Sequence, residues 1–198
     1  MIKDRNIDYR WRKKTIWAKE WANAVGAATA VLDTLDVGGT PVSATLNTSG
    51  VMGFSLDAAG EFVRHVMPVG SDVDWDNDVW FRVLWSSGSS DAADTIDWKI
   101  LWQVVNVGDA LPPTVDQTLE QAIAQDTVTA ANALQVTSAG KLGAGTISSD
   151  NQAVVIDVEM EAFAAGLSEA KLFLGVEMAY IPKFTDGAQI HDNSEPFN

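Results

Sequence analysis

Two neighbouring stretches decide the fold of this chain: Asp78–Trp85 reads DVWFRVLW, and Thr95–Val105 reads TIDWKILWQVV. In both, every second residue is large and apolar, a period of two that is typical of a strand with one buried face. The residues on the expected buried faces are Val79, Phe81, Val83 and Trp85 in the first stretch, and Ile96, Trp98, Ile100, Trp102 and Val104 in the second. We therefore expect two core strands of a β-sandwich.

The same alternation extends over the chain from residue 50 onward. Asn151–Met160 and Lys171–Tyr180 are predicted as further core strands, and Glu61–Met67 and Val128–Val136 as weaker ones. The segments between them are rich in turn-forming residues, at intervals typical of antiparallel topology. The pattern predicts an antiparallel sandwich, with a helical crossing between the sheets over Val115–Ala124.

Length and composition limit the class of protein. The chain has 198 residues, of which 46% are hydrophobic and 20% charged, as in globular proteins. It has no cysteine, which excludes a disulfide framework, a thiolate nucleophile and a cysteine-based zinc site. Nowhere do 18 apolar residues follow one another, and no apolar stretch follows the N-terminal charges. We expect neither a transmembrane helix nor a signal peptide.

Charge is distributed unevenly along the chain. The net charge is −14, but residues 1–20 hold seven basic and three acidic side chains, a balance of +4 that leaves −18 for the remainder. Because the remainder of the chain is strongly acidic, it repels phosphate groups. We therefore expect neither nucleic acid nor an anionic membrane as a partner. Three of the eight tryptophans, Trp11, Trp17 and Trp21, lie in or directly after the basic segment. Such a segment is suited to contact another macromolecule.

These changes of composition divide the chain into four parts. Residues 1–25 form a basic, tryptophan-containing N-terminal arm, with a short helix expected near Lys14–Ala24. Residues 26–49 form a connecting segment rich in small residues, residues 50–182 the sandwich, and residues 183–198 an extended polar tail.

A run of alternating carboxylates precedes the first decisive strand: Asp72, Asp74, Asp76 and Asp78. An EF-hand calcium loop beginning at the first of them would need Gly at its sixth position and Glu at its twelfth, where the chain has Asn77 and Val83. We expect a solvated loop here, rather than a metal site.

Catalytic patterns are weak. Two isolated histidines, His65 and His191, form neither a histidine-rich metal site nor a convincing triad. Ser168–Lys171 matches S-x-x-K, but the S-D-N and K-T-G elements of serine acylases do not occur. Nucleotide-binding glycine motifs are also missing. We expect no enzyme and no cofactor.

Five tryptophans crowd into a short part of the chain: Trp75, Trp80, Trp85, Trp98 and Trp102. The last three lie on the expected inward faces, where large rings fill a sandwich core. Trp75 and Trp80 lie off those faces and are available for a subunit interface or for stacking on a sugar. Trp80, Leu84 and Leu101 form the apolar set that we predict to be partly exposed in a monomer and covered between subunits.

Several segments resemble, in order, a family of virion proteins. They are Phe62–Pro68 (FVRHVMP), Asp78–Trp85, Asp97–Trp102 (DWKILW), Val107–Leu111 (VGDAL) and Leu174–Tyr180 (LGVEMAY). Together with the N-terminal arm, they are similar to the single jelly-roll structural proteins of tailed bacteriophages and marine viruses, which serve as decoration or cement proteins or as head fibres. The resemblance extends over residues 50–181 and the arm.

The resemblance implies an all-β fold, an antiparallel jelly-roll sandwich with a short N-terminal arm or helix. It implies a non-enzymatic capsid decoration protein, commonly a homotrimer, that binds the major capsid protein at the virion surface after assembly in the host cytoplasm. We expect the arm to be the anchor, through Arg10, Trp11, Arg12, Lys13, Lys14, Trp17 and Trp21. The alternative is a carbohydrate- or receptor-binding module of a phage fibre or baseplate, because the jelly roll is also a lectin scaffold.

Overall fold

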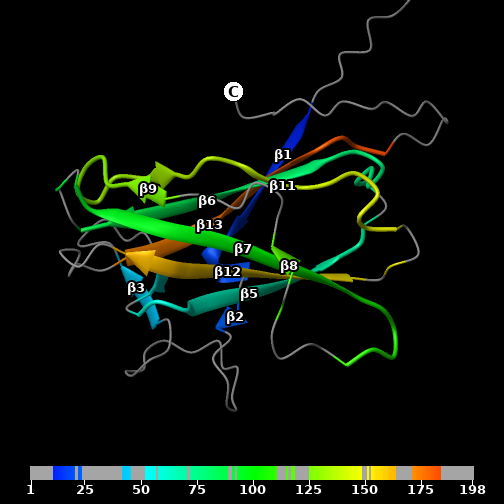
Figure 1. The fold of residues 1–198 in the computed structure, drawn as a ribbon, viewed down its shortest axis with the longest axis horizontal. Helices are drawn as coiled ribbons and strands as arrows, with labels where there is room; N and C mark the ends of the chain where they lie inside the picture. Colours follow the sequence, from blue (N-terminus) through cyan, green and yellow to red (C-terminus); the bar gives the residue numbers. More distant parts are fainter. Residues whose placement is uncertain are drawn as a thin grey trace, which may run out of the picture.

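The structure is a computed structural model that describes residues 11–20, 22–23, 42–45, 52–56, 58–70, 72–88, 91, 93–110, 115, 117–118, 125–148, 151, 153–163 and 171–183. These residues form strands and one short 3₁₀ helix, so the all-β class is confirmed (Figure 1). The elements are β1 (Arg12–Trp17), η1 (Ala18–Glu20), β2 (Ala22–Asn23), β3 (Val42–Thr45), β4 (Met52–Ser55), β5 (Glu61–Pro68), β6 (Val79–Ser87), β7 (Thr95–Val105), β8 (Gln117–Thr118), β9 (Gln125–Thr127), β10 (Gln135–Val136), β11 (Gly140–Leu142), β12 (Ala153–Phe163) and β13 (Lys171–Tyr180).

The described strands form two antiparallel sheets. Sheet 1 has the order β10-β6-β13-β4-β3, with β1 also paired to β13 and β11 to β6. Sheet 2 has the order β2-β5-β12-β7-β8, with β9 also paired to β7, and β5, β12 and β7 lie side by side in Figure 1. Strands β4 to β7 alternate between the sheets, and the last two strands enter their middles: β12 between β5 and β7, β13 between β4 and β6. This interleaved order is the predicted jelly roll.

The core lies between the sheets and includes the inward faces that the alternation predicted in β6, β7 and β12. In β13 the strict alternation fails at the register shift between Phe173 and Gly175, so Phe173 and Val176 enter the core while Leu172 and Leu174 lie outside it. Trp85 and Trp98 are fully buried, and their ring centroids lie 6.1 Å apart across the interface between the sheets. Phe173 of β13 lies 6.5 Å from Trp98 on the same measure. Trp102 and Val104, nearer the end of β7, are only partly buried and pack against the edge of this core. Alternating strands bury one face each, because successive side chains point to opposite sides.

Both helix predictions are wrong where the structure describes the chain. Near Lys14–Ala24 the chain forms β1, a single turn of 3₁₀ helix and β2. In Val115–Ala124, the described pair Gln117–Thr118 forms β8 against Leu101 and Trp102 of β7. In both places a strand with unsatisfied backbone groups lies alongside, and pairing with it outweighs the weak local preference for a helix.

Strand β1 occupies a position that β4 leaves open. Strand β4 pairs only with Leu172 and Phe173 of β13, whereas β1 pairs with Gly175 to Tyr180 farther along the same edge. Ile16 of β1 is 1% exposed and belongs to the main core. The boundary predicted between the arm and the sandwich is therefore wrong for residues 12–17, which are part of the sandwich.

The N-terminal segment also connects the two sheets. Only η1 and one residue separate β1 in sheet 1 from β2, which pairs with β5 in sheet 2. Next to this connection, His65 Nδ1 lies 2.8 Å from the Glu20 carbonyl oxygen. The predicted connecting segment 26–49 contains β3, which pairs with β4 along four residues. Of the predicted tail, only Lys183 is described.

The pairing of β1 depends on a glycine. A Cβ atom at Gly175 would lie 2.5 Å from the Ile16 carbonyl oxygen, closer than two such atoms can approach. Gly175 also has a φ of +155° and follows a register shift between Phe173 and Gly175. No other residue type lets the two backbones come this close.

We predict that Gly175→Ala lowers the free energy of unfolding by about 3 kcal/mol, because the added methyl group displaces β1 from β13. The control is Gly60→Ala, whose φ is +84° but whose added Cβ would meet nothing within 4 Å. It should cost only about 1 kcal/mol of backbone strain. Urea denaturation measures both variants, and equal losses would contradict the close approach of β1.

Candidate functional site

Strand β1 brings four of the seven predicted anchoring residues onto six consecutive positions. Arg12, Lys13 and Lys14 are exposed, and Trp17 is 49% exposed. Trp11, just before the strand, is half-buried, and its Nε1 is buried without a hydrogen-bond partner. The other two predicted residues, Arg10 and Trp21, lie outside the described part of the chain.

The register of β1 places these side chains on opposite sides of sheet 1. Paired residues in an antiparallel ladder point to the same side. The residues paired with Tyr180, Met178 and Val176 of the core side are Arg12, Lys14 and Ile16. The residues paired with Ala179, Glu177 and Gly175 of the outer side are Lys13, Thr15 and Trp17. Lys13 and Lys14, although adjacent, therefore belong to different surfaces.

Cations from distant parts of the sequence join Lys13 on the outer side. The register sets Lys13 beside Ala179, Ala179 beside Trp80, and Trp80 beside Lys141. The Lys141 ammonium lies 6.0 Å from the centroid of the Trp80 ring and 3.3 Å from a carboxylate oxygen of Asp78. Sequence analysis missed Lys141, because nothing in the sequence indicates that β11 and β1 flank the same pair of strands.

The next row of this face holds an ion pair. Glu177 lies between Thr15 and Arg82 in the register. One carboxylate oxygen of Glu177 accepts hydrogen bonds from Arg82 Nε at 2.8 Å and from Nη2 at 2.6 Å. Both side chains are mostly covered, which strengthens a pair relative to one in open water.

We call this surface the sheet 1 face. Its described charged and tryptophan side chains are Lys13, Trp17, Asp78, Trp80, Arg82, Lys141 and Glu177.

The outer side of sheet 2 has the opposite character. Arg64 donates two hydrogen bonds of 2.7 Å to the two carboxylate oxygens of Asp157, which raises the pKa of Arg64 above its ordinary value. Lys99 lies 3.5 Å from a carboxylate oxygen of Glu161. Glu159 shares this side, since it pairs with Lys99 in the register. Carboxylates thus outnumber cations among these described side chains.

The residues predicted for a subunit interface are covered within the chain. Trp80 is 5% exposed and Leu84 6% exposed, so the expectation that a monomer exposes them is wrong. Leu84 packs with Leu172, Leu174 and Val136 in a small cluster outside sheet 1. On sheet 2, Leu101 is partly buried against the cluster of Val105, Val115 and Val155. A residue off the main core face is therefore not necessarily exposed, because satellite clusters form on the outer sides of both sheets.

The carboxylates of the aspartate run bind neighbouring groups of the chain. Asp74 accepts hydrogen bonds from the Asp76 backbone N–H at 3.2 Å and from Asn77 Nδ2 at 3.0 Å. Asp78 is buried and accepts from the Ala144 N–H at 2.8 Å. These bonds shape the loop before β6, as aspartates do in turns.

The first carboxylate of the run binds a buried tyrosine. The Tyr180 hydroxyl donates a hydrogen bond of 3.0 Å to Asp72 Oδ2. Burial raises the pKa of Tyr180, and the bond to Asp72 raises it further, because both favour the protonated hydroxyl. Among the described residues, no three histidine, aspartate or glutamate side chains are placed to bind a metal ion together.

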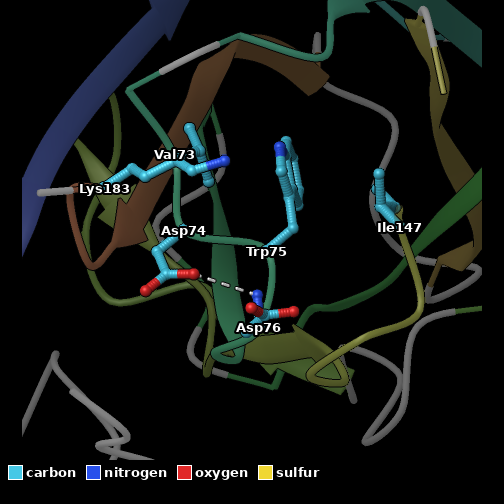
Figure 2. A pocket seen from close by; sticks show the side chains of 6 residues that line it. All are labelled: Val73, Asp74, Trp75, Asp76, Ile147 and Lys183. Carbon is cyan, nitrogen blue, oxygen red and sulfur yellow. Dashed lines mark hydrogen bonds between the residues drawn. The ribbon is translucent and has the colours of Figure 1, made fainter. Parts of the chain in front are cut away.

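A small hollow lies beside this run. It encloses about 70 Å³ and is lined by Val73, Asp74, Trp75, Asp76, Ile147 and Lys183. Figure 2 shows Trp75 between Val73 and Lys183 on one side and Ile147 on the other. Trp75 is 7% exposed, and its Nε1 is buried without a hydrogen-bond partner. The prediction that Trp75 could offer an exposed ring is wrong.

The weak catalytic patterns gain nothing from the structure. His65 lies within β5 with its Nδ1 on the Glu20 carbonyl. Lys171 of the S-x-x-K match is buried, with its ammonium 4.1 Å from the centroid of the Phe163 ring, and Ser168 and His191 lie outside the described residues.

Comparisons with known proteins add little. No family model and no curated protein matches the chain. One similar solved structure is the Clostridium thermocellum endo-1,4-β-D-xylanase 10B, CBM22-1 and GH10 modules in complex with xylohexaose, at a TM-score of 0.45 and 12% identity. The match covers 91% of this chain and 30% of that one. This likeness is too low to support any inference about function.

Among described residues, no helix is long and apolar enough to cross a membrane.

We predict that Trp80→Ala lowers the free energy of unfolding of this chain by about 3 kcal/mol, because it removes a buried ring. Trp17→Ala, which removes an exposed ring, should change it by less than about 0.5 kcal/mol. Chemical denaturation over a range of protein concentrations separates this effect from dissociation of subunits. A Trp80→Ala protein of unchanged stability would show that the ring is not packed as described.

We also predict that calcium leaves the melting temperature unchanged, because Asp74 and Asp78 already bind groups of the chain. Differential scanning calorimetry with millimolar Ca²⁺ and with chelator measures this. The control is Asp78→Ala, which should lower stability by about 1–3 kcal/mol through loss of the bond to Ala144. A rise of several degrees with Ca²⁺ that disappears in Asp74→Asn would contradict the prediction.

Proposed function

We propose that this protein is a non-enzymatic virion structural protein, a capsid decoration protein that binds the major capsid protein through strand β1. The observation that carries the proposal is that Arg12, Lys13, Lys14 and Trp17 are exposed on a strand held in the sandwich. The resemblance of the strand segments to phage virion proteins supports the same function.

The uneven charge of the chain favours such an attachment. A short cationic strand on a body of net negative charge orients the approach to an acidic surface and increases the association rate. Exposed charges are screened within about 10 Å at 0.1 M salt, so they contribute little to lasting affinity. A tryptophan docked in a desolvated pocket is a typical source of that affinity. Trp17 is suited to this part of the contact.

A homotrimer is part of the proposal, as in the family that the chain resembles. Its interface differs from the one that the sequence suggested, because Trp80 and Leu84 are buried within one chain. These two residues therefore stabilise the sandwich in this proposal, and the surface between subunits lies elsewhere.

The alternative, a carbohydrate- or receptor-binding module, has less support. Sugar stacking requires an exposed aromatic face, and the two tryptophans that we considered for it, Trp75 and Trp80, are both buried. Trp17 is the exposed ring among the described tryptophans, and it lies on the same strand as the exposed cations Arg12, Lys13 and Lys14. This combination favours a protein surface over a neutral glycan.

Deletion of the basic segment is not a clean test, because it removes β1 from the sheet and Ile16 from the core. We predict instead that the triple variant Lys13→Glu, Lys14→Glu, Trp17→Ala binds undecorated capsids more than about tenfold more weakly, the loss expected for a truncated hot-spot tryptophan alone. Co-sedimentation with capsids at several salt concentrations measures the affinity.

The control is Lys99→Glu with Lys183→Glu, which changes the net charge equally at positions outside β1. It should retain binding. Unchanged binding by the folded triple variant would refute attachment through β1.

A further inference from the structure

We infer that the docking surface is the whole sheet 1 face, and that its partner is an acidic protein surface with an apolar pocket for Trp17. This inference rests on the proposed function and deepens it: it names the side of β1 that docks, adds residues from β6 and β11, and defines the chemistry of the partner.

The charged residues of β1 lie on two different sides of sheet 1. Lys13 and Trp17 are on the outer side of sheet 1, and a flat partner can contact both together. Arg12 and Lys14 are on the core side, at the open edge of the sandwich. One rigid strand cannot place both sets against the same flat surface, because its side chains alternate. In the part of the chain that the structure describes, the outer set is continuous with the cations Arg82 and Lys141.

Both cations and carboxylates lie on the sheet 1 face. Its cations come from three separate strands, Lys13 of β1, Arg82 of β6 and Lys141 of β11, and they outnumber the carboxylates, Asp78 and Glu177. The body of the chain has a net charge of −18 after residue 20, so an excess of cations on one face is unusual for it. Opposite potentials on the two partners would fix the orientation of the complex.

Trp17 presents an exposed ring on a strand that is already ordered. Its neighbour across the ladder is Gly175, which has no side chain and leaves the ring 49% exposed. Because the backbone of β1 is already paired with β13, docking this ring orders little further chain. An exposed tryptophan on an ordered strand is well suited to fill a pocket of the partner.

The partner is a protein rather than a polyanion. Glu177 lies in the middle of the face, between Thr15 and Arg82, and Asp78 lies beside Lys141. The Asp78 carboxylate is buried, but a uniformly anionic polymer or bilayer would bring its charges against that of Glu177, whereas a protein surface can place a polar or basic group there.

The test compares two adjacent lysines. Lys13→Glu and Lys14→Glu change the charge equally on opposite sides of one strand, and circular dichroism checks that both variants fold. In capsid co-sedimentation we expect Lys13→Glu and Trp17→Ala each to weaken binding about tenfold, as truncated hot spots do. Lys14→Glu should weaken binding less than Lys13→Glu does, because Lys14 contributes only as a charge at the rim of the contact. Lys13→Gln replaces Lys13→Glu if the latter does not fold, with a smaller loss expected.

A second variant tests the part of the face away from β1. Lys141→Met keeps the aliphatic stem over Trp80 but removes the charge, and it should weaken capsid binding severalfold. Lys99→Met, on the outer side of sheet 2, is its control and should bind like the wild type.

The outcomes separate this inference from the proposed function. Equal losses in Lys13→Glu and Lys14→Glu, or no loss in Lys141→Met, would overturn the sheet 1 face and leave attachment through β1 intact. Wild-type binding by every variant would refute the proposed function as well. Binding to duplex DNA or to phosphatidylserine vesicles that depends equally on Lys13 would overturn the assignment of a protein partner.

Discussion

The contact of three aromatic rings between the sheets is the interaction on which the rest of the structure depends. Trp98 of β7 packs against both Trp85 of β6 and Phe173 of β13, which are neighbours in sheet 1, and all three side chains are almost completely buried. Rings of this size bury more apolar area than any other side chains, and their packing fixes how the two sheets lie against each other. The Trp85 indole N–H donates a 2.7 Å hydrogen bond to Asp126, which fixes β9 beside the core. This hydrogen bond therefore links β9 to the aromatic core.

In sheet 1, β4 pairs with only a short part of the edge of β13, and this determines where the N-terminal segment lies. Because β4 ends its pairing with β13 early, a stretch of β13 has backbone groups available, and β1 satisfies them. Gly175 allows the close approach and Ile16 secures it by entering the core. A segment whose charges would otherwise favour solvent becomes an ordered strand. Its cations then have fixed directions, which is what a selective contact with another surface requires.

Much of the fold followed from the sequence, and much of the candidate site did not. The period of two identified β5, β6, β7, β12 and β13, because each of these strands is at least eight residues long and carries apolar residues at alternate positions over much of its length. Helices were predicted near Lys14 and Val115, where short strands form, because local propensity is weak and a distant strand edge is invisible in the sequence. Trp80 and Leu84 were predicted to be partly exposed, since the alternation identifies the main core face but not the clusters outside the sheets.

The sequence by itself determined the class of fold, the inward faces of β6, β7 and β12, and the concentration of cations and tryptophans near the N-terminus. These properties are local, since they depend on residue type and on spacing along the chain. Only the tertiary structure decided that β1 belongs to sheet 1, that Lys13 and Lys14 lie on opposite sides of it, and that Lys141 shares a surface with Lys13. These facts depend on pairing between strands far apart in the chain. The free energy of the whole core selects such pairing, so the pairing cannot be predicted from any single segment of the sequence.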